Sequence, residues 1–337
     1  MKISIYDVAK KAGVSISTAS KALNDRKDVG ESTKERIRSI ARELNYEPSH
    51  FARALAMRKT DNIGVLTVRY FPAPVITNPF YSKIIEGIEE CLIRENLNLV
   101  TNILRKEQVE GLETPKMVKE KAVDGIILLG HMPEGFVKEI IGRGLPAVMV
   151  DNKSFDGSVS TVMIDNEGGA YNAVTRLINT GHKRIAYLSG PSSRESFKKR
   201  REGYSKALSD KGLSPDGRFV VFNETGEPGY SWMKKILSHD EKPDAVFACN
   251  DVTAILAVNM LKEAGFRVPR DISVVGFDNI DMGTHFIPAI ATVDVNKEMM
   301  GVKSAEKLLE LINNKNAGPG EMIFPTRFIS RDSLKER

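Results

Sequence analysis

Residues 4–24 read SIYDVAKKAGVSISTASKALN and predict two short helices separated at one glycine. Ser4 is placed to cap the first helix, with Asp7 three residues later as its capping-box partner. Gly13 supplies the left-handed residue that ends this helix, and Ser15 is placed to cap the second helix. Two helices joined by a glycine turn at this spacing are typical of a helix-turn-helix, whose second helix lies in the DNA major groove. The same residues also fit an ordinary helical hairpin.

A third helix is predicted directly after these two. Ser32 and Glu35 form a second capping-box pattern, and apolar residues then recur with helical spacing until the helix ends near Asn45. Residues 1–60 hold 13 Lys and Arg against 7 Asp and Glu, out of 49 and 44 in the whole chain. The positive excess of the protein therefore lies in this segment, and such an asymmetry favours binding to a phosphate backbone. The basic side chains expected on the outer face of the third helix are Lys34, Arg36, Arg38 and Arg42.

Residues 48–57 read PSHFARALAM, a proline and a cap followed by under three turns of helix. A helix this short is marginal in water by itself. Residues 4–60 as a whole resemble the DNA-binding head and hinge of the LacI/GalR (lactose repressor–galactose repressor) family of transcriptional regulators. The resemblance rests on Asp7-Val8-Ala9, Ala12-Gly13-Val14-Ser15, Thr18, Leu23-Asn24, Asn45-Tyr46-x-Pro48 and Ala52-Arg53-x-Leu55.

The resemblance implies a division of labour in binding DNA. The second helix reads the major groove, and the hinge helices of two subunits pair in the minor groove, where Leu55 wedges between base pairs. Ile16 and Ser17 hold positions that most often set operator preference. Lys21 stands where arginine is common in the family, and a lysine contacts guanine as a point charge without the guanidinium fork. The implied DNA-binding residues are Ser4, Ile5, Tyr6, Ser15, Ile16, Ser17, Thr18, Ser20, Lys21, Asn24, His50, Ala52, Arg53, Leu55 and Ala56.

The length of 337 residues suits a small head followed by one large or two medium domains. The isoelectric point near 9.0 agrees with a nucleic-acid partner. No apolar N-terminal stretch or membrane-spanning run is present, so we expect a cytoplasmic protein with no membrane partner. Cys91 and Cys249 lie in apolar contexts and are expected to be buried free thiols. No residues have metal-ligand spacing, and we expect neither a metal nor a cofactor.

From residue 62 onward, short apolar runs alternate with amphipathic helical stretches. This alternation is typical of a parallel sheet buried on both faces. The number of such units exceeds one compact open sheet, and segment 154–160 is the expected break. We therefore predict an α/β body of two doubly wound lobes. Strands are predicted at 63–68, 97–104, 125–129, 147–150, 162–164, 185–188, 219–222, 245–248 and 273–277, and helices at 80–95, 109–121, 135–143, from 166, 197 and 252, and around 232.

Polar residues follow several of these strands, and doubly wound sheets bind ligands outside the carboxyl ends of their strands. Carboxylates, a carboxamide and a guanidinium that converge there can hold vicinal hydroxyls by paired hydrogen bonds. An aspartate after a strand is also commonly a helix cap or turn former, which is what we expect of Asp165 and Asp251. An arginine among basic neighbours also fits a surface position. The polar residues that we single out are Asp151, Arg200, Asn250 and Asp278.

The body also resembles the effector-binding core of the same family, through Gly181-His182, 185–190, Arg200-x-x-Gly203-Tyr204, Asn250-Asp251, 272–278 and Pro325-Thr326 with Arg331-x-Ser333. That core has a periplasmic-binding-protein-like fold whose chain crosses three times between lobes. The resemblance implies a head at 1–47, a hinge helix and linker at 48–60, and a bilobal effector-binding and dimerisation domain at 61–337. The N-terminal lobe would hold about 61–160 and 290–325, and the C-terminal lobe about 161–289 and 326–337. The implied effector-binding residues are Asn78, Phe80, Tyr81, Asp151, Arg200, Phe222, Asn250 and Asp278.

Two departures leave the effector open. An aromatic residue often follows the strand at 219–222 in sugar-binding members, and here Phe222 is the nearest candidate. Val295 stands where the lactose repressor has a glutamine that helps bind sugar. The effector is predicted to be a sugar or sugar derivative, with a purine or nucleoside, or a protein co-regulator, as alternatives.

The resulting interpretation is a repressor that binds a pseudo-palindromic operator as a homodimer, because dimer symmetry is imposed on the DNA. After Arg331 the chain shows no heptads for a tetramerising tail. An enzyme on a doubly wound fold, with Asp151 or Asp278 as base or nucleophile, is a rival interpretation. No glycine-rich phosphate loop or nucleophile elbow favours it. A transport-associated sugar-binding protein is a second rival, and the basic head argues against it.

Overall fold

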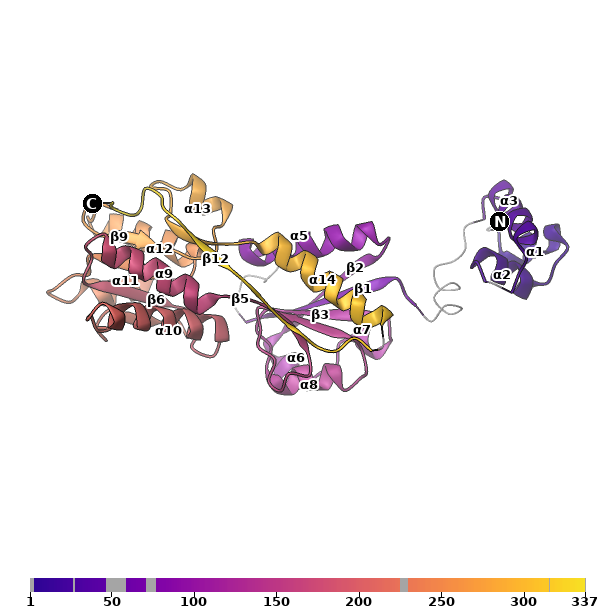
Figure 1. The fold of residues 1–337 in the computed structure, drawn as a ribbon, viewed down its shortest axis with the longest axis horizontal. Coiled ribbons are helices and arrows are strands. Elements are labelled where there is room, and N and C mark those ends of the chain that lie inside the picture. Colours follow the sequence, from indigo (N-terminus) through magenta and orange to yellow (C-terminus); the bar gives the residue numbers. More distant parts are fainter. Residues whose placement is uncertain are drawn as a thin grey trace. The chain divides into compact units, whose positions relative to one another are not determined.

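The computed structural model describes residues 3–26, 28–46, 59–70, 77–224, 230–314 and 316–336. The chain divides into two compact units, residues 1–62 with 122–124 and residues 63–121 with 125–337, and each is considered by itself. Figure 1 labels their helices and strands. The predicted hinge helix lies outside the described residues.

The first unit contains three helices, α1 (Ile5–Ala12), α2 (Ile16–Leu23) and α3 (Glu31–Glu43). Their inward faces form a small apolar core, so none of the three has to be stable alone. Alanine at many of these positions lets the short helices approach closely. The buried residues are Val8, Ala9, Ala12, Ala19, Ala22, Val29, Ile37 and Ala41.

The local signals predicted for the helix-turn-helix are confirmed. The backbone N–H of Ser4 donates to Asp7 Oδ2 at 2.9 Å, and the Ser4 hydroxyl donates to the same oxygen at 2.7 Å. Gly13 follows α1 with φ +64°, a conformation that glycine adopts without steric cost. Ser15 Oγ accepts from the backbone N–H of Thr18 at 3.0 Å and caps α2.

Two predictions about α3 are wrong. The helix is capped by Gly30 and begins at Glu31, so Ser32 lies inside its first turn. Lys34 is buried, with 4% of its surface exposed. Its Nζ lies 3.0 Å from Asp25 Oδ1 and 2.7 Å from Glu31 Oε1. The side chain is buried because its ammonium group is satisfied by two carboxylates.

The second unit begins with a six-stranded sheet in the order β11-β5-β4-β3-β1-β2. We call this sheet and its helices the N-terminal lobe. In Figure 1, α5 (Pro79–Arg94) and α14 (Lys297–Asn313) cover one face, and α6 (Lys106–Glu110) and α8 (Glu134–Ile141) lie on the other. The strands are β1 (Asn62–Arg69), β2 (Asn98–Arg105), β3 (Gly125–Leu129), β4 (Ala147–Val150), β5 (Ser160–Ile164) and β11 (Glu321–Phe324).

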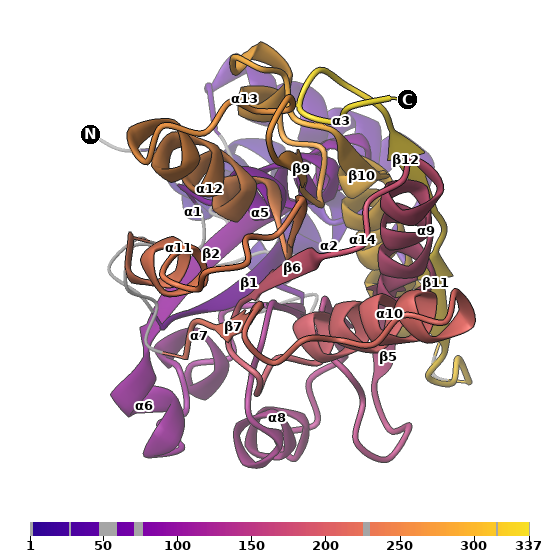
Figure 2. The same ribbon diagram turned by 90° about the vertical axis from the view of Figure 1, so that its left-hand side faces the viewer.

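A four-stranded parallel sheet in the order β7-β6-β8-β9 forms what we call the C-terminal lobe. Helices α9 (Asn166–Asn179) and α10 (Glu195–Asp210) lie on one side of it. Helices α11 (Tyr230–Leu237) and α12 (Asp251–Glu263) lie on the other, with α13 (Asp281–His285) nearby (Figure 2). The strands are β6 (Ile185–Ser189), β7 (Val220–Phe222), β8 (Ala245–Ala248) and β9 (Ser273–Val275).

The chain passes between the two lobes at three places. The first crossing joins β5 to α9. The second runs along β10 (Thr292–Val295) to α14, and the third joins β11 to β12 (Thr326–Ile329). β10 and β12 pair in antiparallel fashion and form a two-stranded ribbon. Figure 1 shows this ribbon and the neighbouring chain running from one lobe to the other.

The predicted boundary near residue 160 falls too early. β5 pairs with β4 and β11 in the sheet of the N-terminal lobe, so the crossing follows Ile164. The segment 154–159 is part of the loop between β4 and β5, two neighbouring strands of one sheet. A break in hydrophobic pattern marks a loop but does not say in which sheet the next strand pairs.

Two further elements differ from their predictions. The helix predicted at 109–121 is divided into α6 and α7 (Lys116–Lys119), because Gly111 ends α6 and Pro115 caps α7. The strand predicted at 273–277 ends at Val275, and the backbone N–H of Gly276 then bonds to Ala291 O. The remaining strands and helices were predicted to within a few residues.

Both cysteines are buried free thiols, as predicted. None of the helices in the described parts of the chain combines the length and apolarity that crossing a membrane takes. Within those same parts, no group of three or more His, Cys, Asp and Glu side chains is arranged to hold a metal ion.

Candidate functional site

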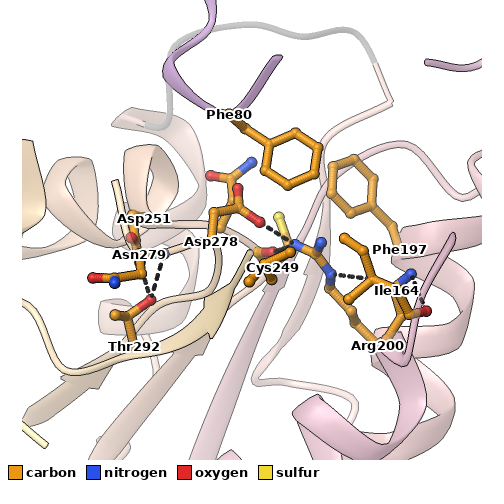
Figure 3. Close-up of polar contacts among 12 residues, drawn as sticks. Phe80, Ile164, Phe197, Arg200, Cys249, Asp251, Asp278, Asn279 and Thr292 are labelled. Atoms are coloured by element: carbon orange, nitrogen blue, oxygen red, sulfur yellow. Dashed lines mark hydrogen bonds and ion pairs between the residues drawn. The ribbon is translucent and has the colours of Figure 1, made fainter. Parts of the chain in front are cut away.

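Three of the predicted effector residues lie at the carboxyl ends of strands, and a fourth, Arg200, contacts one of them. Asp151 follows β4, Asn250 follows β8, and Asp278 follows β9. Arg200 projects from α10 toward Asp278, and Figure 3 shows the pair with its neighbours. The site is therefore built at the place where doubly wound sheets bind ligands.

Arg200 is 3% exposed, and hydrogen bonds, an ion pair and an aromatic contact hold its side chain in place. Its Nη1 lies 3.2 Å from Asp278 Oδ1 and also donates to the carbonyl oxygen of Cys249. Its Nε donates to Asn166 Oδ1 at 2.8 Å. The guanidinium carbon lies 3.7 Å from the centre of the Phe277 ring, in cation–π contact. These contacts fix the plane and the direction of the guanidinium.

The two carboxylates of the site are in unusual environments. Burial raises the pKa of Asp278 to about 6, although the charges of Arg200 and Lys297 oppose the rise. Burial also raises the pKa of Asp151, whose Oδ2 accepts a 2.6 Å hydrogen bond from the Tyr81 hydroxyl. Asp151 Oδ1 is buried and accepts no hydrogen bond from the described residues. A buried carboxylate oxygen without a partner is costly, so this atom is a natural acceptor for a ligand hydroxyl.

Aromatic rings complete the surroundings of the pair. Phe80 comes from the N-terminal lobe and Phe197 from the C-terminal lobe, and Figure 3 shows both rings pointing toward Arg200 and Asp278. Both belong to one continuous cluster of buried apolar residues that draws on both lobes. Asn78 caps α5 by accepting from the backbone N–H of Phe80 at 2.9 Å, and so places the ring at the start of that helix.

Two predicted effector residues have other contacts. Phe222 faces Arg201, whose guanidinium carbon is 4.9 Å from the ring centre. Both line a separate cavity of about 290 Å³ between α10 and β7. Asn250 Oδ1 accepts from the backbone N–H of Thr253 at 2.8 Å and caps α12.

Of the two helix caps predicted at Asp165 and Asp251, one is confirmed and one is wrong. Asp165 is confirmed, because its Oδ1 accepts from Gly168 N at 2.8 Å. Asp251 is not the cap of α12. It is fully buried, and its two oxygens accept from the Thr292 hydroxyl at 2.5 Å and from the backbone N–H of Ile280 at 2.8 Å. Burial, reinforced by the negative charge of Asp278, raises the pKa of Asp251 to about 7.

Sequence reasoning missed a second polar group near this site. The guanidinium carbon of Arg194 lies 5.9 Å from the Tyr70 ring centre and 5.7 Å from that of Phe197. Tyr70 in turn lies 5.6 Å from the His131 ring. Burial raises the pKa of Tyr70 to about 12 and lowers that of His131. The available signal was positional, since Tyr70 follows β1 and His131 comes shortly after β3, at the same sheet edge as Asp151.

In the first unit, α2 presents the predicted DNA-reading face. Ile16 is 49% exposed and Ser17 is also exposed, while Tyr6 on α1 is 59% exposed. Lys21 Nζ lies 2.6 Å from Asp28 Oδ2 at the surface. Of the other predicted residues, Ser4 and Ser15 are exposed, and Ile5, Thr18, Ser20 and Asn24 are half-buried. His50, Ala52, Arg53, Leu55 and Ala56 lie outside the described residues, so their roles stay predictions.

Known proteins resemble the chain over its full length. Residues 4–49 match the family described as bacterial regulatory proteins, lacI family, and residues 174–334 match the periplasmic binding protein-like domain. The HTH-type transcriptional repressor PurR of Vibrio atlanticus is 33% identical over 337 residues, which cover 98% of each chain. The ribose operon repressor of Escherichia coli is 33% identical over 312 residues, which cover 91% of this chain and 92% of its own.

A solved structure extends the likeness to three dimensions. The lac repressor dimer bound to operator and the anti-inducer ONPF superimposes with a TM-score of 0.84 at 25% identity, over 99% of this chain and 100% of that one. Family matches at both ends of the chain, full-length relatives and a common fold agree with one another. The chain belongs to the lacI family of bacterial regulatory proteins, which are DNA-binding transcriptional repressors controlled by small-molecule effectors.

Proposed function

We propose that this regulator responds to a small polyhydroxyl effector, a sugar or sugar derivative, held by Asp151, Arg200 and Asp278. The observation that carries the proposal is the buried pair of Arg200 and Asp278 beside a carboxylate with an unsatisfied oxygen, Asp151 Oδ1. Fixed donors and acceptors of this kind match the alternating donors and acceptors of vicinal hydroxyls. The ribose operon repressor, a relative at 33% identity, agrees with a carbohydrate-linked role.

Phe80 and Tyr81 contribute the apolar and orienting part of the proposed effector site. The ring of Phe80 offers a flat surface on which the less polar face of a sugar packs. The Tyr81 hydroxyl holds Asp151 in position through its 2.6 Å hydrogen bond. Asn78 contributes indirectly, by capping the helix that carries both aromatic residues. Asn250 and Phe222 have weaker support, since their described contacts serve α12 and the separate cavity.

A purine or nucleoside is the second candidate effector. The specific observation in its favour is the presence of Phe80 and Phe197 around the ion pair, since two aromatic rings can stack on a planar base. Arg200 and the carboxylates would then hydrogen-bond to ring nitrogens and exocyclic groups. A protein co-regulator is a further alternative, for which the described residues offer no specific support.

On the DNA side, we propose that two copies of the chain bind a pseudo-palindromic operator through α2 of each head and through residues 49–57. The lac repressor structure, a dimer on operator, supports this arrangement. The effector favours one relation between the lobes, and that relation determines whether the two short hinge segments fold together. The relatives are repressors and not enzymes, and we propose that this chain also performs no catalysis and acts in the cytoplasm.

A thermal-shift screen with D-ribose, cellobiose and hypoxanthine tests the effector class. A ligand at one hundred times its Kd stabilises the protein by about 2.7 kcal/mol, which raises the Tm of a domain this large by several degrees. Asp278→Asn should lose the shift. Asp216→Asn, which alters a half-buried carboxylate paired with Arg218, should keep it. A compound that shifts wild type and Asp278→Asn equally binds elsewhere and contradicts the proposed site.

A further inference from the structure

The turn that contains Asp278 is hydrogen-bonded to the second crossing between the lobes. Asp278 and Asn279 both have positive φ, +107° and +52°. The backbone N–H of Asp278 donates to Val293 O at 2.9 Å, and its carbonyl oxygen accepts from Lys297 Nζ at 2.6 Å. Val293 lies in β10 and Lys297 begins α14. The backbone beside the proposed effector carboxylate therefore moves with the crossing chain.

The side chain of Asn279 extends this attachment to a further crossing. Its Nδ2 donates to Asp294 Oδ1 on β10 at 2.8 Å. Its Oδ1 accepts from Arg331 Nη2 at 2.7 Å, and Arg331 follows β12. One amide thus links the second and third crossings to each other and to the residue next to Asp278.

Arg200, the partner of Asp278, is attached to the first crossing. Its Nε donates to Asn166 Oδ1 at 2.8 Å, and Asn166 Nδ2 donates to Ile164 O at the end of β5 at 3.3 Å. Figure 3 shows the ion pair between these two attachments, with Ile164 on one side and Asn279 on the other. The first and second crossings therefore reach the Arg200–Asp278 pair through direct hydrogen bonds. The third crossing reaches it through Asn279, the residue next to Asp278.

We propose that Asn279 is a positioning residue that locks the Asp278 turn to the crossing chains and so sets the angle between the two lobes. A rigid-body rotation of the lobes bends the chain at its crossings, so bonds that tie the crossings together select which angles are populated. The consequence for effector response rests on the proposed function. The lock itself is a property of the free protein.

Asparagine suits this position for two physical reasons. It tolerates the left-handed conformation better than most residues, and its amide supplies a donor and an acceptor at once. Aspartate would keep the acceptor for Arg331 but set two carboxylates against each other at Asp294. Glycine would keep the backbone conformation and lose both side-chain bonds. These substitutions therefore separate the side-chain lock from the strain of the turn.

The test measures the distance between the lobes in the full-length protein without DNA or effector. Spin labels are attached at Lys116→Cys in the N-terminal lobe and Lys211→Cys in the C-terminal lobe, both exposed positions. The native thiols are buried. Labelled chains are mixed with an excess of unlabelled chains, so that pulsed electron–electron double resonance reports distances within one chain. The variants are Asn279→Gly, Asn279→Asp, and Asn279→Asp combined with Asp294→Asn.

We expect one narrow distance distribution for wild type and a shifted or broadened one for both single variants. The double variant exchanges the amide and the carboxylate, restores a hydrogen bond between positions 279 and 294, and should return the distribution to wild-type width. A loss of stability alone would not produce this rescue. A wild-type distribution in Asn279→Gly, or no recovery in the double variant, would overturn the proposal. Because no ligand or operator is used, failure here is distinct from failure of the proposed effector class.

Discussion

Arg200 and Asp278, 78 positions apart in the sequence, form a buried ion pair with Nη1 and Oδ1 3.2 Å apart. Burying two charges is costly, and the pair is retained only because further groups satisfy it. On the arginine side these are Asn166 Oδ1 and the Cys249 carbonyl oxygen. The pair is therefore fixed in place, and the capacity for a ligand lies in the other carboxylate, because Asp151 Oδ1 is buried and has no hydrogen-bond partner among the described residues.

Removing either member of this pair should abolish the effector response. Asp278→Ala leaves the Arg200 guanidinium buried without its partner, and breaking a buried ion pair costs about 3–5 kcal/mol. Asp278→Asn is the gentler change, because it keeps the shape and removes the charge. We expect both variants to bind operator DNA and to ignore the compound found in the thermal-shift screen, measured by fluorescence anisotropy. A full response in Asp278→Asn or Arg200→Ala would remove that residue from the site.

Leu55→Ala should weaken operator binding by about tenfold or more. Unstacking a base step costs a few kcal/mol, which the apolar wedge helps to offset, and a tenfold loss of affinity corresponds to only about 1.4 kcal/mol. The position lies outside the described residues, so this prediction rests on the sequence resemblance. Effector binding, measured by calorimetry, should not change. Leu55→Met keeps most of the apolar volume and serves as the control. Equal operator affinity in wild type and Leu55→Ala would refute the wedge.

Lys21→Ala should reduce the salt dependence of operator binding. A lysine that contacts a phosphate or a base edge releases counterions, and each such charge contributes about 0.9 to the slope of log K against log salt concentration. Lys11→Ala is the matched control, since Lys11 is paired with Glu43 on α3 and lies off the reading helix. Titrations at several salt concentrations measure both slopes. If the two variants give the same slope, Lys21 makes no special contact with DNA.

Ser15→Ala should destabilise α2 by about 1 kcal/mol, because it removes the hydroxyl that satisfies the Thr18 amide. Ser17→Ala lies two residues further along, is also exposed, and removes no described cap. Hydrogen exchange of the α2 amides in the full-length protein should therefore quicken several-fold in Ser15→Ala and little in Ser17→Ala. The cap would be unimportant if both variants exchanged alike.

Asp251→Asn should flatten the dependence of stability on pH. The pKa of Asp251 is raised to about 7 in the folded chain, against an ordinary value of 3.8. The folded chain therefore binds this proton more tightly than the unfolded chain. The resulting stability is fully present below about pH 4 and is lost as pH rises through about 7. Asparagine carries no such proton, and its amide still meets Thr292 and Ile280.

Urea unfolding between pH 4 and pH 8 measures this effect. The wild-type free energy of unfolding should fall more steeply over that range than that of Asp251→Asn, at about 1.4 kcal/mol for each unit of pKa difference. Asp240→Asn, at an exposed position, should follow wild type. Parallel curves for wild type and Asp251→Asn would show that folding does not raise the pKa of Asp251.

The sequence alone determined the features that depend on neighbours along the chain. Ser4, Gly13 and Ser15 mark the ends of α1 and α2, because a cap or a left-handed turn is satisfied by backbone groups within a few residues. The alternation of apolar runs and amphipathic helices likewise located most strands and helices of both lobes. Resemblance to a known family named Asp151, Arg200 and Asp278, and the structure brings Arg200 and Asp278 into contact.

Tertiary structure alone decided which distant groups meet. It assigned β5 to the sheet of the N-terminal lobe and buried Lys34 between two acidic side chains. It also placed Phe222 against Arg201 and gave the buried Asp251 hydrogen bonds from Thr292 and Ile280. It also revealed Asn279 as the junction of the crossing chains. Whether a charge is buried and which group an amide bonds to depend on residues tens of positions away. Short-range sequence patterns therefore do not predict them.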